Sequence, residues 1–272
     1  MDANVELKFS RRGAGAPVVF AHGTPTYSGE YEQVANQIEN SNQSILIDHL
    51  GFGDSPKPID GDYSISAHRI RFRQTLRQKG IKKFHLVVHD FGGVIALPLL
   101  TESDSEVLSL TIINSWYWPL IETEPQMKSQ KILLDSGIFP FLYKYFNFSP
   151  KVLLKLAWGS HSPLTKERHR HYISKFPTKD DRHGPIGFLK ALFDFKNSVW
   201  LEADQLSKIK TPVQIIWGEA DKLLSTRNLE RWEAIFPKAK VVRFKNVGHF
   251  VGDEAPELLA KELIDFFRTF AK

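Results

Sequence analysis

Apolar and polar positions along this chain follow two alternating patterns. Short apolar runs typical of strands cover residues 5–10, 17–21, 44–48, 84–89, 109–115, 213–217 and 240–244. Segments with helical spacing lie between or after them, at 30–39, 66–79, 91–101, 227–236 and 256–270. This alternation predicts an α/β fold, with a mostly parallel sheet and helices on both of its faces.

One long segment interrupts the alternation. Residues 117–200 show no strand pattern, are rich in aromatic residues, and have apolar residues at helical spacing, for example from Leu153 to Ala157. Prolines at seven positions between 119 and 185 divide the segment into short pieces. Because so long a loop without structure is uncommon in a compact domain, we predict a helical cap at 117–200. Residues 1–116 and 201–272 would then form the core.

The composition restricts the possible partners. Hydrophobic residues make up 42% of the chain and charged residues 25%, as in ordinary globular proteins. The net charge of +5 does not indicate a polyanion partner, because 36 Lys and Arg residues are interspersed with 31 acidic ones. There is no cysteine, no signal-peptide pattern, and no apolar run of the roughly 18 residues that cross a bilayer. We therefore expect a cytoplasmic protein without metal, nucleic-acid or membrane partners; the oligomeric state stays open.

The most informative motif follows the strand at 84–89. There His89-Asp90-Phe91-Gly92-Gly93 leads from a buried strand into a helix, a turn that in an α/β-hydrolase raises its central residue above the sheet as a nucleophile. That residue is usually Ser or Cys, and here it is Asp90. A carboxylate attacks carbon without first losing a proton, and the product of the attack is an ester of the enzyme. Asp90 therefore predicts displacement at saturated carbon rather than peptide or lipid hydrolysis.

Two further residues follow in the chain order that the α/β-hydrolase fold uses. Asp221 comes after the strand at 213–217, and His249 comes after the last strand. His249 would bind Asp221 through one ring nitrogen and take a proton from the attacking water with the other. The backbone N–H groups of Thr24 and Phe91 are the candidates for stabilising the oxyanion. The structural alternatives are a helix N-cap at Asp90, a turn residue at Asp221 and a buried structural histidine at His249.

Five motifs together resemble one branch of the α/β-hydrolases. They are HGTPT at 22–26, GFGDS at 51–55, VVHDFGG at 87–93, WGEAD at 217–221 and VGHF at 247–250. The chain outside the cap resembles the haloalkane dehalogenases, with epoxide hydrolases as close relatives. The resemblance implies that Asp90 displaces halide, that His249 activates water, that Asp221 is the supporting acid, and that no cofactor is needed. Some members carry the acid after the preceding strand; that position here is Asn114, which favours Asp221.

Two positions depart from the dehalogenase pattern. The residue after the nucleophile is usually Trp, whose indole N–H holds the halide, whereas Phe91 has no donor. The third residue of the HGxP turn is often Asn or Glu, whereas Thr24 offers only a hydroxyl. The candidates for binding substrate or halide are Thr24, Phe91, Trp116, Trp118 and Trp158, and packing in the apolar core is the alternative for each tryptophan.

We predict a hydrolase that acts on a small, largely apolar substrate and is haloalkane dehalogenase-like. An epoxide hydrolase is the first alternative, and its proton donor would be a cap tyrosine: Tyr143, Tyr145 or Tyr172. A β-lactone decarboxylase-like enzyme is a further one. The alternative of another class is a non-catalytic binding protein that kept the pocket of the hydrolase fold.

Overall fold

A seven-stranded sheet forms the centre of the computed structural model, which describes residues 5–101, 105–194 and 203–270. The strand order is β1-β3-β2-β4-β5-β6-β7, and every neighbouring pair is parallel except β1 with β3. The predicted fold class is confirmed. The strands are β1 (Phe9–Arg12), β2 (Ala16–Ala21), β3 (Asn42–Ile47), β4 (Lys83–Asp90), β5 (Glu106–Ser115), β6 (Val213–Gly218) and β7 (Lys240–Phe244).

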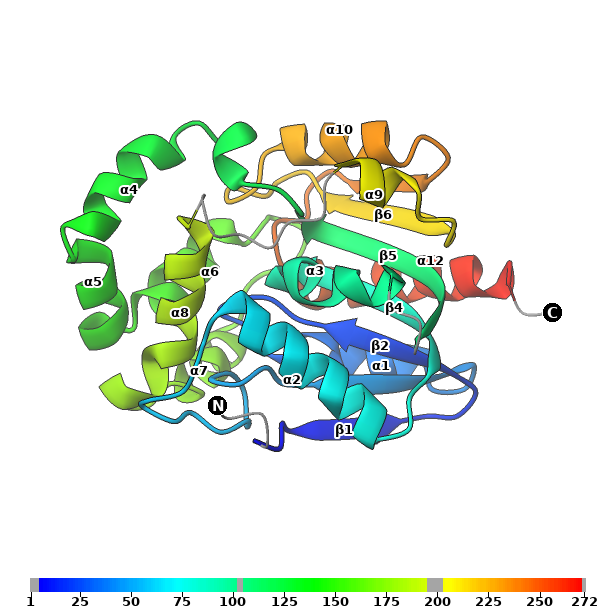
Figure 1. Cartoon of the computed structure of the whole chain (residues 1–272), viewed down its shortest axis with the longest axis horizontal. Helices are drawn as coiled ribbons and strands as arrows, with labels where there is room; N and C mark the ends of the chain where they lie inside the picture. Colours follow the sequence, from blue (N-terminus) through cyan, green and yellow to red (C-terminus); the bar gives the residue numbers. More distant parts are fainter. Residues whose placement is uncertain (1–4, 102–104, 195–202, 271–272) are drawn as a thin grey trace.

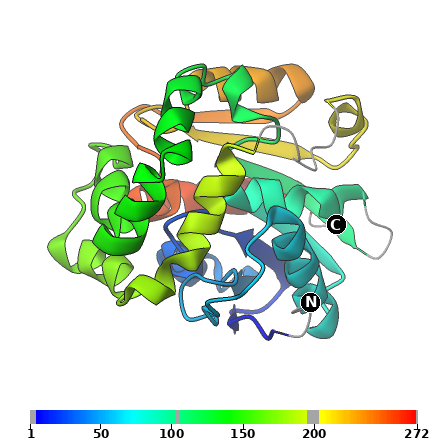
Figure 2. The same cartoon turned by 60° about the vertical axis from the view of Figure 1, so that its left-hand side comes forward.

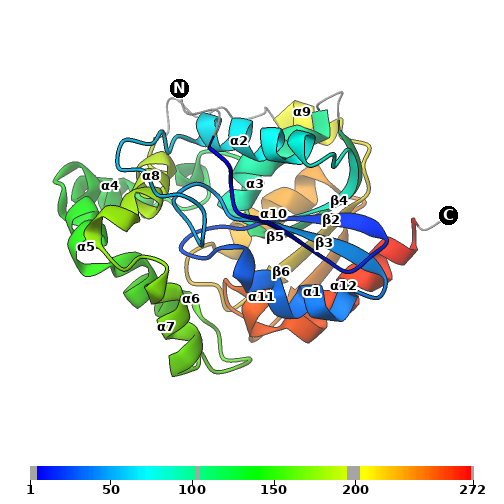
Figure 3. The same ribbon diagram turned by 90° about the horizontal axis from the view of Figure 1, so that it is seen from below.

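Helices cover both faces of the sheet. Figure 3 shows α2 (Ile65–Gln78) and α3 (Phe91–Ala96) on one face, and α1 (Glu32–Ile38), α11 (Val251–Glu254) and α12 (Pro256–Arg268) on the other. The short α9 (Ala203–Ser207) precedes β6, and α10 (Thr226–Ile235) connects β6 to β7. Successive side chains of a strand point to opposite faces, so Val19 and Ala21 enter one apolar cluster while Val18 and Phe20 enter the other. A sheet that is buried on both faces explains why its central strands are apolar throughout.

The first strand differs from the prediction. The apolar pattern predicted a strand at 5–10, whereas β1 covers Phe9–Arg12 and pairs antiparallel with β3 at the edge of the sheet. Three of its four residues are exposed and polar, as is common for an edge strand. The preceding segment still lies beside the sheet, because the carbonyl of Lys8 accepts a hydrogen bond from the N–H of Asp48 at 3.0 Å. Hydrophobicity alone could not locate a strand that buries so little.

Between β5 and β6 the chain forms a series of helices. They are α4 (Met127–Asp135), α5 (Ile138–Phe146), α6 (Leu154–Ala157), α7 (Lys166–Ser174) and α8 (His183–Leu192), joined by short η helices. These inserted helices, green to yellow-green in Figures 1 and 2, gather beyond the ends of the strands. The predicted boundary at 200/201 falls outside the described residues. Within the described ranges, no helix has the length and apolar character needed to cross a membrane.

A buried histidine couples folding to pH. The ring of His68 lies against those of His49, Tyr63 and Phe188. Burial lowers its pKa to about 3, and the charge of Arg71 contributes in the same direction. In the unfolded chain a histidine takes up its proton near pH ~6.5, so the stability from a neutral His68 is complete above that pH and is lost as the pH falls toward 3.

We therefore expect the melting temperature of His68→Phe to fall less steeply than that of the wild type as the pH is lowered over this window. Circular dichroism measures both melting temperatures, and parallel slopes would contradict the expectation.

Candidate active site

Asp90 lies at a sharp turn between β4 and α3. Its backbone has φ 50° and ψ −126°, a region that residues other than glycine rarely occupy. Two glycines leave room for this turn. A Cβ on Gly23 would lie 2.3 Å from the side chain of Asp90, and a Cβ on Gly92 would lie 2.0 Å from the carbonyl oxygen of Ala21. The glycines therefore allow β4 to end with its carboxylate raised at the edge of the sheet.

Two backbone N–H groups hold the carboxylate of Asp90. The N–H of Thr24 donates to Oδ1 at 2.8 Å, and the N–H of Phe91 is a further donor. Nε2 of His249 lies 3.3 Å from Oδ2. Burial disfavours the charge of Asp90, but the hydrogen bond and charge of His249 outweigh that effect and lower the pKa of the carboxyl. The side chain is thus an anion, bonded by the same two N–H groups that the sequence proposes for the oxyanion.

His249 and Asp221 meet on the other side of this carboxylate. Nδ1 of His249 is 2.6 Å from Oδ2 of Asp221, while Oδ1 of Asp221 accepts the N–H groups of Leu223 and Leu224. Burial opposes the imidazolium charge, but Asp221 and Asp90 outweigh it and raise the pKa of His249 to about 10. The histidine therefore rests as a cation between two carboxylates. The structure brings together all three residues that the chain order selected.

Asn114, at the end of β5, orients the acid. Its side-chain N–H donates to Oδ2 of Asp221 at 2.8 Å, and its Oδ1 accepts the N–H of Gly218 at 2.8 Å. The amide of Asn114 thus holds the carboxylate of Asp221 from the neighbouring strand, in position to contact His249.

The carboxylate of Asp90 faces a cavity of about 230 Å³. Apolar side chains of the inserted helices form much of its wall, among them Met127, Phe139, Tyr143, Phe148, Leu153 and Leu189. The hydroxyl of Thr24 is buried and has no hydrogen-bond partner within the described part of the chain. Glu124, Gln126, Gln130, Ser149 and Lys222 add polar groups to this wall. A cavity whose wall is largely apolar suits a largely apolar ligand.

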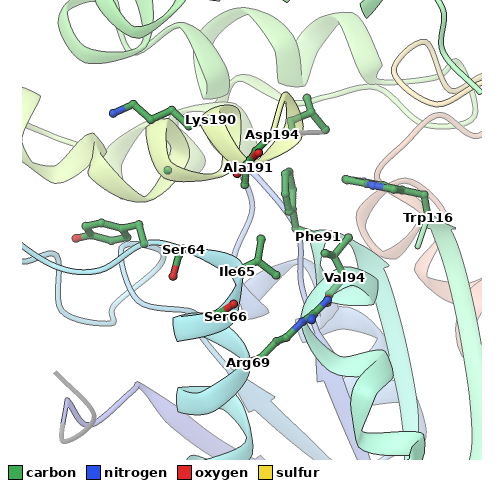
Figure 4. A pocket seen from close by; sticks show the side chains of 13 residues that line it. Ser64, Ile65, Ser66, Arg69, Phe91, Val94, Trp116, Lys190, Ala191 and Asp194 are labelled. Atoms are coloured by element: carbon green, nitrogen blue, oxygen red, sulfur yellow. The ribbon is translucent and has the colours of Figure 1, made fainter. Parts of the chain in front are cut away.

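A second cavity, of about 430 Å³, adjoins the first and shares part of its lining. Figure 4 shows it between the start of α2, with Ser64 and Ser66, and the end of α8, with Lys190 and Ala191. Phe91, Trp116 and Leu192 line both cavities and therefore separate them. The ring of Phe91 stacks on that of Phe188, with 4.4 Å between the ring centroids. It meets the ring of Trp116 edge to face, with 5.0 Å between the centroids. Phe91 and Trp116 thus lie between the space beside Asp90 and a more polar compartment.

Comparison with known proteins shows the fold family of the chain. The family model described as "alpha/beta hydrolase fold" matches residues 16–256. The chain belongs to the α/β-hydrolase fold family. This α/β-hydrolase is similar to the cis-3-alkyl-4-alkyloxetan-2-one decarboxylase of Shewanella oneidensis, with 26% identity over 93% of this chain and 82% of that protein. It is also similar to haloalkane dehalogenase 2 of Mycobacterium tuberculosis, with 25% identity over 96% of this chain and 91% of that protein.

Solved structures show the same fold. The haloalkane dehalogenase DbeA from Bradyrhizobium elkani superposes with a TM-score of 0.85, covering 98% of this chain and 95% of that chain. The identity is 17%, so this likeness supports the architecture of the α/β-hydrolase alone.

The tryptophans that the sequence proposed for halide binding lie in different places. Trp116 lines the cavity of Asp90. The indole N–H of Trp118 donates instead to Oδ1 of Asn228 at 3.1 Å, deep in the core. Trp158 directly follows α6 and donates to the carbonyl of Ser162 at 2.8 Å, beside a different surface cavity. The structure thus places one of the three at the cavity of Asp90 and the other two elsewhere.

The cap tyrosines also separate. Tyr143 lines the cavity of Asp90, and burial raises the pKa of its hydroxyl. Tyr145 is 53% exposed, and the hydroxyl of Tyr172 donates to the carboxylate of Asp253. Tyr143 is therefore the one of the three that lies at the site.

A buried pair, Glu30 with His89, supports His249. The carboxylate of Glu30 lies 3.1 Å from Nδ1 of His89, and both side chains are 2% exposed. Nε2 of His89 is 2.9 Å from the backbone carbonyl of His249. Glu30 belongs to a segment with an ordinary amphipathic pattern, in which a glutamate predicts an exposed position. Nothing in the sequence indicates this long-range pair.

Glu254 connects the His249 loop to the inserted helices. Its Oε2 accepts the N–H of Gly248 at 2.9 Å and the N–H of Gly159 at 2.8 Å. The N–H of His249 itself donates to the carbonyl of Ala157 at 2.9 Å. One buried carboxylate thus fixes the loop that carries the histidine against the segment that follows α6.

We expect Glu254→Ala to slow turnover by about tenfold or more, because two backbone N–H groups lose their acceptor and the histidine shifts from its position. If Asp90 forms an ester with the substrate and Glu254 acts through His249, the loss should appear in ester hydrolysis, so more Asp90 adduct should accumulate at steady state by intact-protein mass spectrometry. Glu257→Ala, an exposed carboxylate three residues later, is the matched control. A fall in turnover without any rise in adduct would argue against this role.

Proposed function

We propose that this α/β-hydrolase is an enzyme that forms an ester between Asp90 and a saturated carbon of a small, largely apolar substrate, in the manner of a haloalkane dehalogenase. The observation that carries the proposal is the carboxylate at the turn after β4, bonded by two N–H groups and lying within reach of the His249–Asp221 pair. The inserted helices would act as the cap that covers the substrate. The presence of all three side chains at interacting distances favours an enzyme over a non-catalytic binding protein.

In the first step a carboxylate oxygen of Asp90 attacks the carbon that bears the halogen. The C–O bond forms while the carbon–halogen bond breaks, and the halide leaves with the bonding electron pair. No proton moves in this step, so the cationic resting state of His249 does not hinder it. The apolar cavity wall strips water from the carboxylate and from the reacting carbon.

In the second step water cleaves the ester. Esterification removes the negative charge of Asp90, which is one of the two charges that keep the pKa of His249 high. His249 can then release its proton to solvent and take one from the attacking water. The oxyanion lies where the N–H groups of Thr24 and Phe91 point, and each such donor is worth roughly 3 kcal/mol. The alcohol leaves with the proton from His249, and Asp90 retains one oxygen from water.

Halide release from a panel of bromoalkanes tests this proposal, with a single turnover in heavy-oxygen water as the mechanistic control. We expect bromide and alcohol in equal amounts, and one heavy oxygen in the peptide that contains Asp90. Turnover that leaves this peptide unlabelled would contradict the ester mechanism whatever the substrate.

A second candidate is an enzyme whose leaving group is a ring oxygen, as in an epoxide or a β-lactone. Two observations favour it: the hydroxyls of Tyr143 and Thr24 at the cavity, where they can donate to an alkoxide, and the similarity to a protein named as an alkyl-oxetanone decarboxylase. The products distinguish the cases, since an epoxide gives a diol and a decarboxylated β-lactone gives an alkene and carbon dioxide. This candidate would be selected if the enzyme released no bromide from bromoalkanes but formed a diol from an epoxide, or an alkene and carbon dioxide from a β-lactone.

We expect Phe91→Trp to increase dehalogenation by about tenfold, because an indole N–H beside the nucleophile supplies a charge-assisted hydrogen bond to the leaving halide. The second cavity beside Phe91 offers space for the larger ring. The measurement is kcat/KM for a bromoalkane together with bromide inhibition. Phe91→Leu, which lacks any donor, is the control, and equal rates in both variants would show that an indole N–H here does not serve the halide.

A further inference from the structure

The outer side of α4 and α5 exposes many large apolar side chains. Eleven large hydrophobic residues are exposed within the described ranges, and eight of them lie between positions 132 and 156. We call the six on α4 and α5 the apolar surface: Ile132, Leu133, Ile138, Phe141, Tyr145 and Phe146. The exposed fraction reaches 68% for Ile132 and 57% for Phe146. Scattered single residues of this kind are ordinary, but a cluster marks an interaction site.

The apolar surface is continuous around α5. The ring of Phe141 lies 4.9 Å from that of Tyr145 and 5.8 Å from that of Phe146. Helix α5 has the sequence IFPFLYKYF, yet Tyr143, at 8% exposed, is its one buried residue. In Figures 1 and 3 the two helices form the margin of the molecule that lies farthest from the C-terminus. Half of the apolar side chains of α5 therefore remain exposed: Ile138, Phe141, Tyr145 and Phe146.

Lysines predominate in the stretch of chain that contains the apolar surface. Residues 126–158 contain five lysines, at 128, 131, 144, 151 and 155, but one acidic residue, Asp135, which pairs with Lys131 at 2.8 Å. Lys128, Lys151 and Lys155 are exposed. Aromatic and aliphatic side chains with lysines around them are the pattern of a surface that inserts into the boundary of a lipid bilayer and attracts its anionic headgroups.

We propose that the apolar surface of α4 and α5 docks on an anionic phospholipid bilayer. The sequence indicated no membrane partner, because it does not show which apolar residues the inserted helices leave outside. A second copy of the chain fits the surface less well, since a symmetric dimer would bring the same lysines of both copies together. An anionic bilayer instead neutralises them.

Docking would place the cavity of Asp90 next to the lipid. Met127, Phe139 and Tyr143 of the same two helices line that cavity from the inner side. Apolar substrates concentrate in bilayers, so the surface would present the cavity to the phase that contains them. The inference rests on exposure and charge, and it holds whichever bond the enzyme breaks.

Co-sedimentation of the full chain with vesicles of phosphatidylcholine, with or without phosphatidylglycerol, tests the proposal. We expect the chain to bind the anionic vesicles and to bind the neutral ones more weakly. Phe141→Ser with Phe146→Ser should weaken binding to the anionic vesicles by about tenfold or more, because two aromatic side chains no longer insert. Lys151→Glu with Lys155→Glu should lower the preference for anionic vesicles by a similar factor.

Matched controls separate docking from general effects. Ile59→Ser with Leu258→Ser removes two exposed apolar residues outside the surface, and Lys208→Glu with Lys210→Glu reverses two exposed lysines near α9. Both controls should bind vesicles like the wild type. Circular dichroism melts and turnover of a water-soluble substrate verify that Phe141→Ser with Phe146→Ser still folds.

Three results would overturn the proposal. They are no binding of the wild type to anionic vesicles, equal loss of binding in the controls, or a wild-type dimer in light scattering that Phe141→Ser with Phe146→Ser converts to a monomer. The last result would assign the apolar surface to self-association.

Discussion

His249→Gln should form the Asp90 ester at nearly the wild-type rate and then stop. The first step moves no proton, so it does not need the imidazole. Glutamine keeps a side chain of similar reach but cannot take a proton from water, and general-base assistance is worth about 10²- to 10⁴-fold. Rapid-quench measurements should show one equivalent of leaving group released per enzyme, followed by almost no further turnover. Intact-protein mass spectrometry should show the mass of the added alkyl group.

The choice of substrate and control decides how this result is interpreted. A substrate that the wild type turns over is required, and His161→Gln, an exposed histidine, should behave as the wild type. If His249→Gln turns such a substrate over at the wild-type rate, His249 is not the base. If it loses turnover without any adduct, the histidine is needed before the ester forms, and the proposed order of steps is wrong.

The buried strands and the chain order of the site could be predicted from the sequence. Strands β2 to β6 are covered on both faces, so their apolar runs stand out from the surrounding turns. Asp90, Asp221 and His249 each follow a strand of a parallel sheet, and parallel strands end at the same edge, so the order along the chain implied proximity. The distances of 3.3 Å and 2.6 Å that join them agree with that inference.

The side chains that support the site could not be predicted in this way. Glu30 and Glu254 are buried carboxylates whose partners lie 59 and 95 positions away, at His89 and Gly159. A glutamate in an amphipathic segment predicts an exposed position, and the pattern contains no information about a distant partner. The same limit applies to tryptophan, because hydrophobicity does not reveal whether an indole N–H points into a cavity or, as in Trp118, to Asn228.

The inserted helices show a third limit. Apolar spacing predicted helices between 117 and 200, and the described part of that segment contains helices joined by short loops and no strand. Spacing does not reveal which side of a short helix faces the protein when nearly every residue is apolar. In α5 the buried residue is Tyr143, whereas Phe141 and Phe146 face outward. The number of apolar residues on such helices exceeds what the core can cover.

Asp90→Asn should abolish turnover, with a loss of at least about 10⁴-fold, because the neutral amide is too weak a nucleophile to displace a leaving group. The substitution preserves the shape of the side chain and keeps an oxygen for the N–H of Thr24. It also removes one of the two charges that raise the pKa of His249, so this pKa should fall from its raised value. Halide release, mass spectrometry and a histidine titration by nuclear magnetic resonance measure these effects. A substrate adduct on this variant would place the nucleophile elsewhere.

The order of the two steps gives a sharper expectation for the double variant. If Asp90 acts first and His249 second, the double variant Asp90→Asn with His249→Gln should carry no adduct and should be no slower than Asp90→Asn alone, because a blocked first step hides the loss of the second. Independent roles would instead multiply the two losses.

Asp221→Asn should resemble His249→Gln and accumulate ester, since Asp221 acts through the histidine rather than on the substrate. An ester-free Asp221→Asn variant that has lost turnover would place this acid in the first step and contradict the division of roles.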